Sequence, residues 1–369
     1  MDLRNFQPKA LHLFAGPGGM IKGTALAGIR PAVAVEMQAD CCQTLRANYP
    51  EMLVREGPIQ LRVLADYGEE RLEVHTYTYP CKRFSKLAKI SGTWTGEHLY
   101  LEALREGVLL QPSVILVENV EGMLEYPRVM ETWKRLPGYY TTEFRAYGHH
   151  YTHQRKPRVI LILHSEPYTF APLEEYALPR SGERLGDYLD RELDPFTLRE
   201  NPYYLSRMGI GERTYRDRAK IYAPDRVEPV PFFNGYGHDR STYLVRDERA
   251  PFGARPFSPR EFARLHGFIG WPDRESDYLF AGEYGSRYQQ IADSVMPPMA
   301  YAIGRAVVEY FAATAKLKQP QPHLGYREVS SPKAAQEKRS GQQVEPAAPL
   351  AELVGDRWSV VQAPLWDEK

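Results

Sequence analysis

The chain of 369 residues carries no formal net charge, because 47 Lys and Arg residues balance 47 Asp and Glu residues. This length allows one large domain, or a main domain with a smaller partner, and hydrophobic and charged contents of 43% and 25% are those of an ordinary globular protein. The net charge gives no argument for a polyanionic partner, although a local basic face would suffice to bind one.

No apolar run approaches the roughly 18 to 20 residues that span a bilayer, and the first residues lack a signal-peptide core. No membrane partner and a cytoplasmic location are therefore expected. The three cysteines, Cys41, Cys42 and Cys81, exclude a disulfide framework, and without a CxxC pair no metal site is expected. Cys41 and Cys42 are predicted to lie in a helix near the core.

The first predicted elements are a strand over 10–14, a glycine turn in 14-FAGPGGM-20, a helix, and a second strand that ends in Glu36. This order opens a βαβ unit. Glycines between a strand and a helix let backbone N–H groups approach a ligand, although an ordinary βα turn has the same composition. Glu36 is either a hydrogen-bond acceptor for a ribose or a solvated strand end.

A strand-like run, 73-EVHTYTYP-80, leads to Cys81 at the expected carboxyl edge of the sheet. Pro80 fixes the direction of the chain before the thiol. Lys82 and Arg83 would lower the pKa of this thiol and favour the nucleophilic thiolate. The alternative is a surface thiol beside a basic patch.

Two further apolar runs, 113-SVILVEN-119 and 158-RVILILH-164, predict strands that are buried on both faces. Together with the βαβ unit they predict an α/β domain with a largely parallel sheet. Glu118 ends the first run, where an apolar setting would raise the pKa of its carboxyl group and let it act as an acid. Capping of the next helix is the other interpretation of Glu118.

The segment 154-QRKPR-158 leads into the second of these strands. Period-two alternation places Gln154, Lys156 and Arg158 on one side of the extended chain. Cations at this spacing suit a phosphate or a polarised carbonyl.

Composition divides the chain into five parts. Residues 166–253 are rich in Pro, Tyr and Arg and show little periodicity. Residues 254–317 regain helical patterns over 258–268, with a capping box from Ser258 to Glu261, and over 297–317. Residues 318–353 are polar and Pro/Gln-rich, which predicts a disordered linker. In order, the parts are a sheet domain over 1–165, a small irregular domain over 166–253, the returning portion of the sheet domain over 254–317, the linker over 318–353 and a tail of unassigned role over 354–369.

Six motifs, in this order, resemble those of the cytosine-5 DNA methyltransferase family over about residues 10–312. They are FAGPGG with Glu36, Pro80-Cys81 followed by Phe84-Ser85, Glu118-Asn119-Val120, the 154–158 alternation, 255-RPFSPREFARLHGF-268 and 288-YQQIADSVMPP-298. The resemblance implies a class I S-adenosylmethionine-dependent methyltransferase fold, which is Rossmann-like. It places the small irregular domain at the target-recognition position.

The resemblance also implies methyl transfer from S-adenosylmethionine to C5 of a cytosine that is flipped out of duplex DNA. The Cys81 thiolate would attack C6, protonated Glu118 would bond N3, Arg158 would hold the base carbonyl, and Lys156 would hold a phosphate or the thiolate. Asp66 matches its motif poorly, because it lies too close to Cys81 in the sequence. The implied cofactor-binding residues are Phe14, Gly16, Gly18, Glu36, Met37, Asp66, Pro80, Ser294 and Val295.

The segment 203–222 interleaves tyrosines with basic residues, which suits phosphate contact and base stacking, although a solvated face has a similar composition. The expected partners are duplex DNA and, within a restriction-modification system, a cognate restriction endonuclease. The chain is expected to act as a monomer. The expected nucleic-acid contacts are Lys82, Arg83, Ser85, Gln154, Arg213, Arg216, Arg218 and Lys220.

Three departures from the family pattern leave alternatives open. Thr78 replaces a glycine beside the nucleophile, Lys156 replaces an arginine and loses its bidentate fork, and Asp293 replaces a neutral amide beside the cofactor. The same chemistry on tRNA cytosine is one alternative, and a nucleic-acid-binding homologue without catalysis is another. An ordinary Rossmann dehydrogenase would explain the glycine turn but not the other motifs.

Overall fold

The computed structural model describes residues 7–80, 99–198, 208, 219–231 and 243–314. The chain separates into two units, 1–317 and 318–369, and every described residue belongs to the first. Of the helices in the described ranges, none is both long and apolar enough to cross a membrane.

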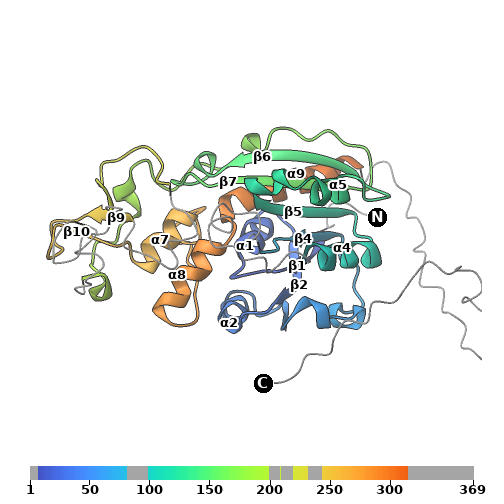
Figure 1. Cartoon of the computed structure of the whole chain (residues 1–369), viewed down its shortest axis with the longest axis horizontal. Coiled ribbons are helices and arrows are strands. Elements are labelled where there is room, and N and C mark those ends of the chain that lie inside the picture. Colours follow the sequence, from blue (N-terminus) through green and yellow to red (C-terminus); the bar gives the residue numbers. More distant parts are fainter. Residues whose placement is uncertain (1–6, 81–98, 199–207, 209–218, 232–242, 315–369) are drawn as a thin grey trace, which may run out of the picture. The chain divides into compact units, whose positions relative to one another are not determined.

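A seven-stranded sheet with the order β3-β2-β1-β4-β5-β7-β6 forms the centre of the first unit (Figure 1). β7 runs antiparallel to both of its neighbours, and the other adjacent pairs are parallel. The predicted α/β domain with a largely parallel sheet is therefore confirmed. The strands are β1 (Lys9–Leu13), β2 (Arg30–Glu36), β3 (Leu53–Glu56), β4 (Val74–Tyr77), β5 (Val114–Val120), β6 (Tyr140–Tyr147) and β7 (Pro157–His164).

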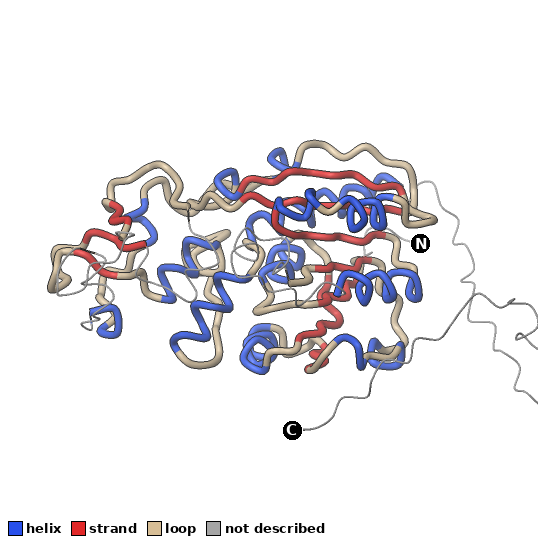
Figure 2. The backbone as a smooth tube through the Cα atoms, viewed as in Figure 1, coloured by secondary structure: helices blue, strands red, loops and turns tan. Residues whose placement is uncertain are grey.

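Continuous apolar runs form the central strands because helices cover both faces of the sheet (Figure 2). In β5, Val114 and Leu116 face the cluster that contains helix α9, whereas Ile115 and Val117 face the opposite cluster. Edge strand β6 mixes polar and aromatic residues, and Tyr140 is 54% exposed. For this reason its sequence lacks the apolar run that predicted β5 and β7.

The helices include both returning segments expected from the sequence. Ser258 accepts a hydrogen bond from the Glu261 amide (3.1 Å), and Glu261 accepts one from the Ser258 amide (2.8 Å), so the predicted capping box is confirmed. The α-helices are α1 (Gly19–Leu26), α2 (Ala39–Asn48), α4 (Leu99–Leu110), α5 (Pro127–Lys134), α7 (Pro259–His266), α8 (Tyr284–Asp293) and α9 (Pro297–Thr314). Short 3-10 turns cover Ile59–Leu61, Leu64–Tyr67, Glu121–Glu125, Gly148–His150, Leu173–Tyr176, Leu185–Tyr188 and Pro195–Leu198.

A second sheet of three short strands, β8 (Lys220–Tyr222), β9 (Tyr243–Arg246) and β10 (Ala254–Arg255), follows the large sheet in the chain. Tyr243 and Val245 of β9 belong to the same apolar cluster as buried residues of α7 and α8. Arg255 is only 2% exposed and forms ion pairs with Asp247 and with capping residue Glu261, at 2.8 Å in each case. The second sheet is thus tied to the helix that returns to the large domain, and the predicted domain boundaries remain predictions.

Helices α1 and α9 approach closely because small residues line their contact. A Cβ atom on Gly23 would collide with the Pro297 carbonyl oxygen, the Tyr301 amide nitrogen and the Ala300 methyl group. Gly285 in α8 has open space where its Cβ atom would stand. The two glycines therefore differ in what surrounds them while both lie in helices.

We expect Gly23→Ala to lower the free energy of unfolding by about 1–3 kcal/mol, because backbone atoms of α9 must move apart to admit the methyl group. Gly285→Ala, the matched control, should raise it by about 0.5–1 kcal/mol through helix propensity. Chemical denaturation of the two variants measures both effects. Equal changes in the two variants would contradict the close-packing argument.

Candidate functional site

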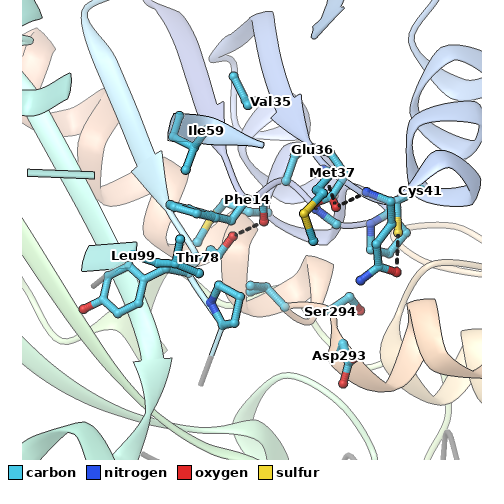
Figure 3. A pocket seen from close by; sticks show the side chains of 18 of the residues that line it. Phe14, Val35, Glu36, Met37, Cys41, Ile59, Thr78, Leu99, Asp293 and Ser294 are labelled. Atoms are coloured by element: carbon cyan, nitrogen blue, oxygen red, sulfur yellow. Dashed lines mark hydrogen bonds between the residues drawn. The ribbon is translucent and has the colours of Figure 1, made fainter. Parts of the chain in front are cut away.

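A cavity of about 610 Å³ opens at the edge of the sheet where β1, β2, β4 and β5 end. Figure 3 shows Phe14, Glu36 and Thr78 from three of these strand ends around it, with Asp293 and Ser294 from the end of α8 on another side. The sequence-predicted residues that line this cavity are Phe14, Gly16, Glu36, Met37, Pro80, Glu118, Arg158, Ser294 and Val295.

The predicted glycine turn between β1 and α1 is present, and three of its residues have a left-handed backbone. Gly16 and Gly18 have φ values of 55° and 96°, and Phe14 has a φ of 59°. A Cβ atom on Gly18 would lie 2.6 Å from the hydroxyl of Tyr278, which donates a hydrogen bond to the Pro17 carbonyl oxygen (2.5 Å). Gly18 supports the turn without lining the cavity, and no sequence signal pointed to Tyr278.

The Glu36 carboxylate fixes this turn against the end of β2. One of its oxygens accepts a hydrogen bond from the Gly16 amide (2.7 Å), and the other accepts from the amides of Met37 and Gln38 (2.8 Å each). Since a carboxylate oxygen has two acceptor positions, the oxygen bound to Gly16 keeps one of them. Glu36 is thus not a solvated strand end. Its carboxylate binds three backbone amides and keeps one acceptor position for a ligand.

Glu118 and Arg158 face each other across neighbouring strands, β5 and β7. The Nε atom of Arg158 lies 2.7 Å from a Glu118 carboxylate oxygen, and both side chains are 8% exposed. Burial raises the pKa of the Glu118 carboxyl group, while the positive charges of Arg158 and Lys156 oppose this shift. The pair therefore places a carboxyl group with an increased tendency to hold a proton, and a guanidinium group, on one wall of the cavity.

Lys156 and Gln154 occupy different positions from those expected of phosphate and DNA contacts. Lys156 is 4% exposed and donates hydrogen bonds to the carbonyl oxygens of Ala292 (2.9 Å) and Ser294 (3.0 Å). Gln154 is completely buried, and its amide lies 2.8 Å from Nδ1 of His266. Neither side chain can meet a phosphate from this position, because each is enclosed by protein.

His266 lies between these two side chains, with Nε2 at 3.3 Å from the Lys156 ammonium and Nδ1 at 3.2 Å from the Phe262 carbonyl oxygen. An ammonium can only donate, so Nε2 accepts and the imidazole proton lies on Nδ1. The amide oxygen of Gln154 has no partner as placed, and exchanging it with the amide nitrogen turns it toward this proton. This assignment gives a partner to both imidazole nitrogens of His266 and to the Lys156 ammonium.

Asp66 does not line the cavity. Its carboxylate accepts a hydrogen bond from the Val63 amide (3.0 Å) and lies 3.9 Å from an Arg62 nitrogen, so it closes the short 3-10 turn Leu64–Tyr67. The segment 57–60 reaches the cavity instead, with Ile59 buried against β2 and β4 residues. Asp66 is therefore not retained among the cofactor-binding residues that the resemblance implied, and its short sequence distance from Cys81 was the signal of this difference.

Thr78 fits its turn without crowding it, because its hydroxyl donates to the Phe14 carbonyl oxygen (2.9 Å). Asp293 lines the cavity next to Ser294 and accepts a hydrogen bond from the Gln289 amide. Lys220 is exposed at the start of β8. The remaining predicted residues, Cys81, Lys82, Arg83, Ser85, Arg213, Arg216 and Arg218, lie outside the described residues, and Pro80 is the last described residue before Cys81.

The model of the family described as C-5 cytosine-specific DNA methylase matches residues 9–309. The type II methyltransferase M.NgoMIV of Neisseria gonorrhoeae is 28% identical over 81% of this chain and 97% of its own length, and M.Eco47II of Escherichia coli is 27% identical over 81% and 78%. The crystal structure of the S. pombe Dnmt2 methyltransferase superposes with a TM-score of 0.64 at 18% identity, covering 83% of this chain and 99% of that one.

The chain belongs to the C-5 cytosine-specific DNA methylase family and is a DNA cytosine-5 methyltransferase. The structural neighbour also confirms the class I methyltransferase fold that the sequence motifs implied.

We expect acid to destabilise the fold partly through His266. Burial, and then the charge of Lys156, lower the pKa of His266 well below its ordinary value, so below about pH 6.5 the unfolded chain binds a proton that the folded chain excludes. The stability is complete above this pH and falls as the pH decreases. Between about pH 5 and 6, His266→Gln should reduce the slope of unfolding free energy against pH by about 1.4 kcal/mol per unit.

Denaturation curves at several pH values measure this slope. His12 and His75, which are buried with pKa values lowered to about 3, remain in both proteins and serve as the internal reference. An identical slope in the variant and the parent protein would show that His266 is protonated in the fold.

Proposed function

We propose that the protein methylates C5 of cytosine in duplex DNA with S-adenosylmethionine as methyl donor, through a covalent adduct between Cys81 and C6 of a flipped base. The observation that carries the proposal is the Glu118–Arg158 pair, which is buried on the wall of the cavity that the glycine turn also lines. Pro80 brings the chain to the same cavity immediately before Cys81.

The cavity has the features that S-adenosylmethionine requires. Its volume of about 610 Å³ lies within the range of about 300–1,000 Å³ for small-molecule sites. Glu36 retains an acceptor position for a ribose hydroxyl, and Ser294 and Val295 line the side near the glycine turn. Among the described lining residues, the acids Glu36 and Asp293 outnumber the single cation Arg158 even when Glu118 holds its proton, which favours a cationic ligand. When bound, S-adenosylmethionine supplies an electrophilic methyl group on its sulfonium.

In the proposed mechanism, the Cys81 thiolate forms a bond to C6 of cytosine. The π electron pair of the C5–C6 double bond then shifts toward C4, and negative charge develops on N3. The Glu118 carboxyl group, which burial keeps inclined to hold its proton, donates to N3 and relieves the developing charge. Arg158 bonds the carbonyl oxygen of the base. C5 would then take the methyl group, with the electron pair of the broken methyl–sulfur bond left on sulfur. A base removes the C5 proton, the electron pair that returns to the C5–C6 bond expels the Cys81 thiolate, and N3 returns its proton to Glu118.

Lys156 acts in this proposal as a positioning residue. Its ammonium binds the carbonyl oxygens of Ala292 and Ser294, which hold the Ser294–Val295 segment against the start of β7. Arg158 lies two residues further along the same strand. The buried ammonium of Lys156 therefore fixes the side of the cavity proposed to bind the cofactor relative to the side proposed to bind the base.

Incubation with methyl-labelled S-adenosylmethionine and unmodified duplex DNA, with tRNA in parallel, tests the function. We expect label in DNA cytosine, none with Cys81→Ser, and a rate that falls about 100-fold or more with Glu118→Gln, because the amide cannot supply a proton. DNA that contains 5-fluorocytosine should trap the parent protein covalently but not Cys81→Ser. Label in tRNA alone would replace the proposed substrate, and binding without label or trap would indicate a homologue without catalysis.

Glu36→Gln and Asp66→Asn form a matched pair for cofactor binding. The first change places an amide group where three backbone amides donate, so the dissociation constant for S-adenosylmethionine should rise about 10-fold or more. The second change alters an acid outside the cavity and should change it by less than about twofold. Titration calorimetry measures both constants, and a larger effect of Asp66→Asn would restore Asp66 to the cofactor site.

A further inference from the structure

The connection between β6 and β7 gathers aromatic and basic side chains outside the cavity. It runs from Tyr147 through the 3-10 turn Gly148–His150 to Arg155. Tyr147 is 39% exposed, and His149, His150 and Arg155 are exposed as well. The rings of His149 and His150 are 4.4 Å apart, and the Tyr147 ring lies 5.8 Å and 6.1 Å from them. We call this segment the 147–155 connection.

The 147–155 connection lies at the same edge of the sheet as the cavity. Strand register pairs Tyr147 with Pro157 and Ala146 with Arg158, and on the other side of β7 it pairs Arg158 with Val120. The Gly148 amide donates to the Lys156 carbonyl oxygen (3.2 Å), and the Arg155 amide donates to the Val230 carbonyl oxygen (2.9 Å). The connection is therefore held next to Arg158, which is the residue proposed to bind the base.

Positive charge concentrates at this connection although the chain as a whole is neutral. Partial burial, and then the charges of His150, Arg155 and Arg180, lower the pKa of His149, so these groups lie within electrostatic reach of one another. Glu174 is an acid in contact with the cluster, 3.1 Å from Nδ1 of His150. Within the described part of the chain, neither arginine forms an ion pair with a carboxylate, which leaves both guanidinium groups for another anion.

We propose that the 147–155 connection, together with Arg180, is a contact surface for the phosphate backbone of duplex DNA beside the target base. This inference rests on the proposed function and adds to it a surface that the sequence motifs did not assign. Two guanidinium groups suit phosphate oxygens because each presents several N–H donors, and neighbouring aromatic rings suit the sugars and bases next to them. The chosen partner is DNA because the chain is a DNA cytosine-5 methyltransferase.

The double variant R155A/R180A tests the surface, with R71A/R135A as the matched control. Arg71 precedes β4 and Arg135 follows α5, so both are exposed arginines at the opposite edge of the sheet, and the control removes the same charge. Binding of fluorescent PCR-amplified duplex DNA is measured over a series of salt concentrations in the presence of S-adenosylhomocysteine. R155A/R180A should weaken binding about 10-fold and reduce the slope of log K against log salt by about 1.8, because about 0.9 is lost for each phosphate contact.

Two further variants test the rest of the cluster. Glu174→Gln removes a negative charge and should strengthen DNA binding. Phosphate favours the protonated imidazole and so opposes the lowering of the His149 pKa by burial and the neighbouring positive charges. Affinity should therefore rise as the pH falls from about 8 to about 6, and His149→Gln should flatten this rise. The groups that face His149 and His150 are Arg155, Arg180, Glu174, Tyr147 and Tyr151.

The outcomes separate this inference from the proposed function. Equal salt slopes in R155A/R180A and R71A/R135A would overturn the phosphate surface even if the parent protein methylates DNA. Weaker binding of tRNA with unchanged binding of DNA would overturn it as well, in favour of an RNA surface. If R155A/R180A alone binds DNA weakly while the parent protein transfers no methyl group, the surface stands and the catalytic proposal fails. At saturating DNA concentration, methyl transfer by R155A/R180A should recover, which shows that the variant is folded.

Discussion

The buried ammonium of Lys156 joins the two parts of the chain that build the site. It stands at the start of β7 and binds the carbonyl oxygens of Ala292 and Ser294, where α8 ends and its carbonyl groups lack helical partners. A cation is favoured there by the helix dipole as well as by the hydrogen bonds. Because Ser294 and Val295 line the cavity and Arg158 follows Lys156 by two residues, this one contact aligns the wall proposed to bind the cofactor with the wall proposed to bind the base.

Burial gives the charged groups around the cavity their chemical character. Removal from water penalises each charged form, and the surrounding partners decide which group stays charged. Lys156 is charged and bound to carbonyl oxygens, so its neighbour His266 remains neutral, and the pKa of Glu118 is raised despite the opposing guanidinium of Arg158. The same desolvation thus keeps an imidazole from taking a proton and inclines a carboxyl group to keep one.

Residues at the ends of buried strands could be predicted from the sequence, because an apolar run fixes both the strand and the edge at which its last residues stand. Glu36 and Glu118 follow this rule. Tyr278 and His266 do not, since Tyr278 meets Pro17 and His266 meets Gln154 only after the chain folds back across long sequence separations. Gln154 was misassigned for the same reason, because alternation predicts a shared side of the chain but not whether a later helix covers that side.

A neutral chain can act on a polyanion when folding sorts its charges by position. Some arginines form buried ion pairs within the fold, such as Arg255, which binds Asp247 and Glu261. Acids gather inside the cavity, which Glu36, Glu118 and Asp293 line, and Glu36 and Asp293 favour the proposed cationic cofactor. Arg155 stays outside, on the chain segment that leads into Lys156 and Arg158. Along these few residues the chain passes from an exposed cation suited to phosphate, through an enclosed cation that binds the end of α8, to a buried cation paired with the Glu118 carboxyl group. The place of each cation in the fold therefore decides which partner it can meet.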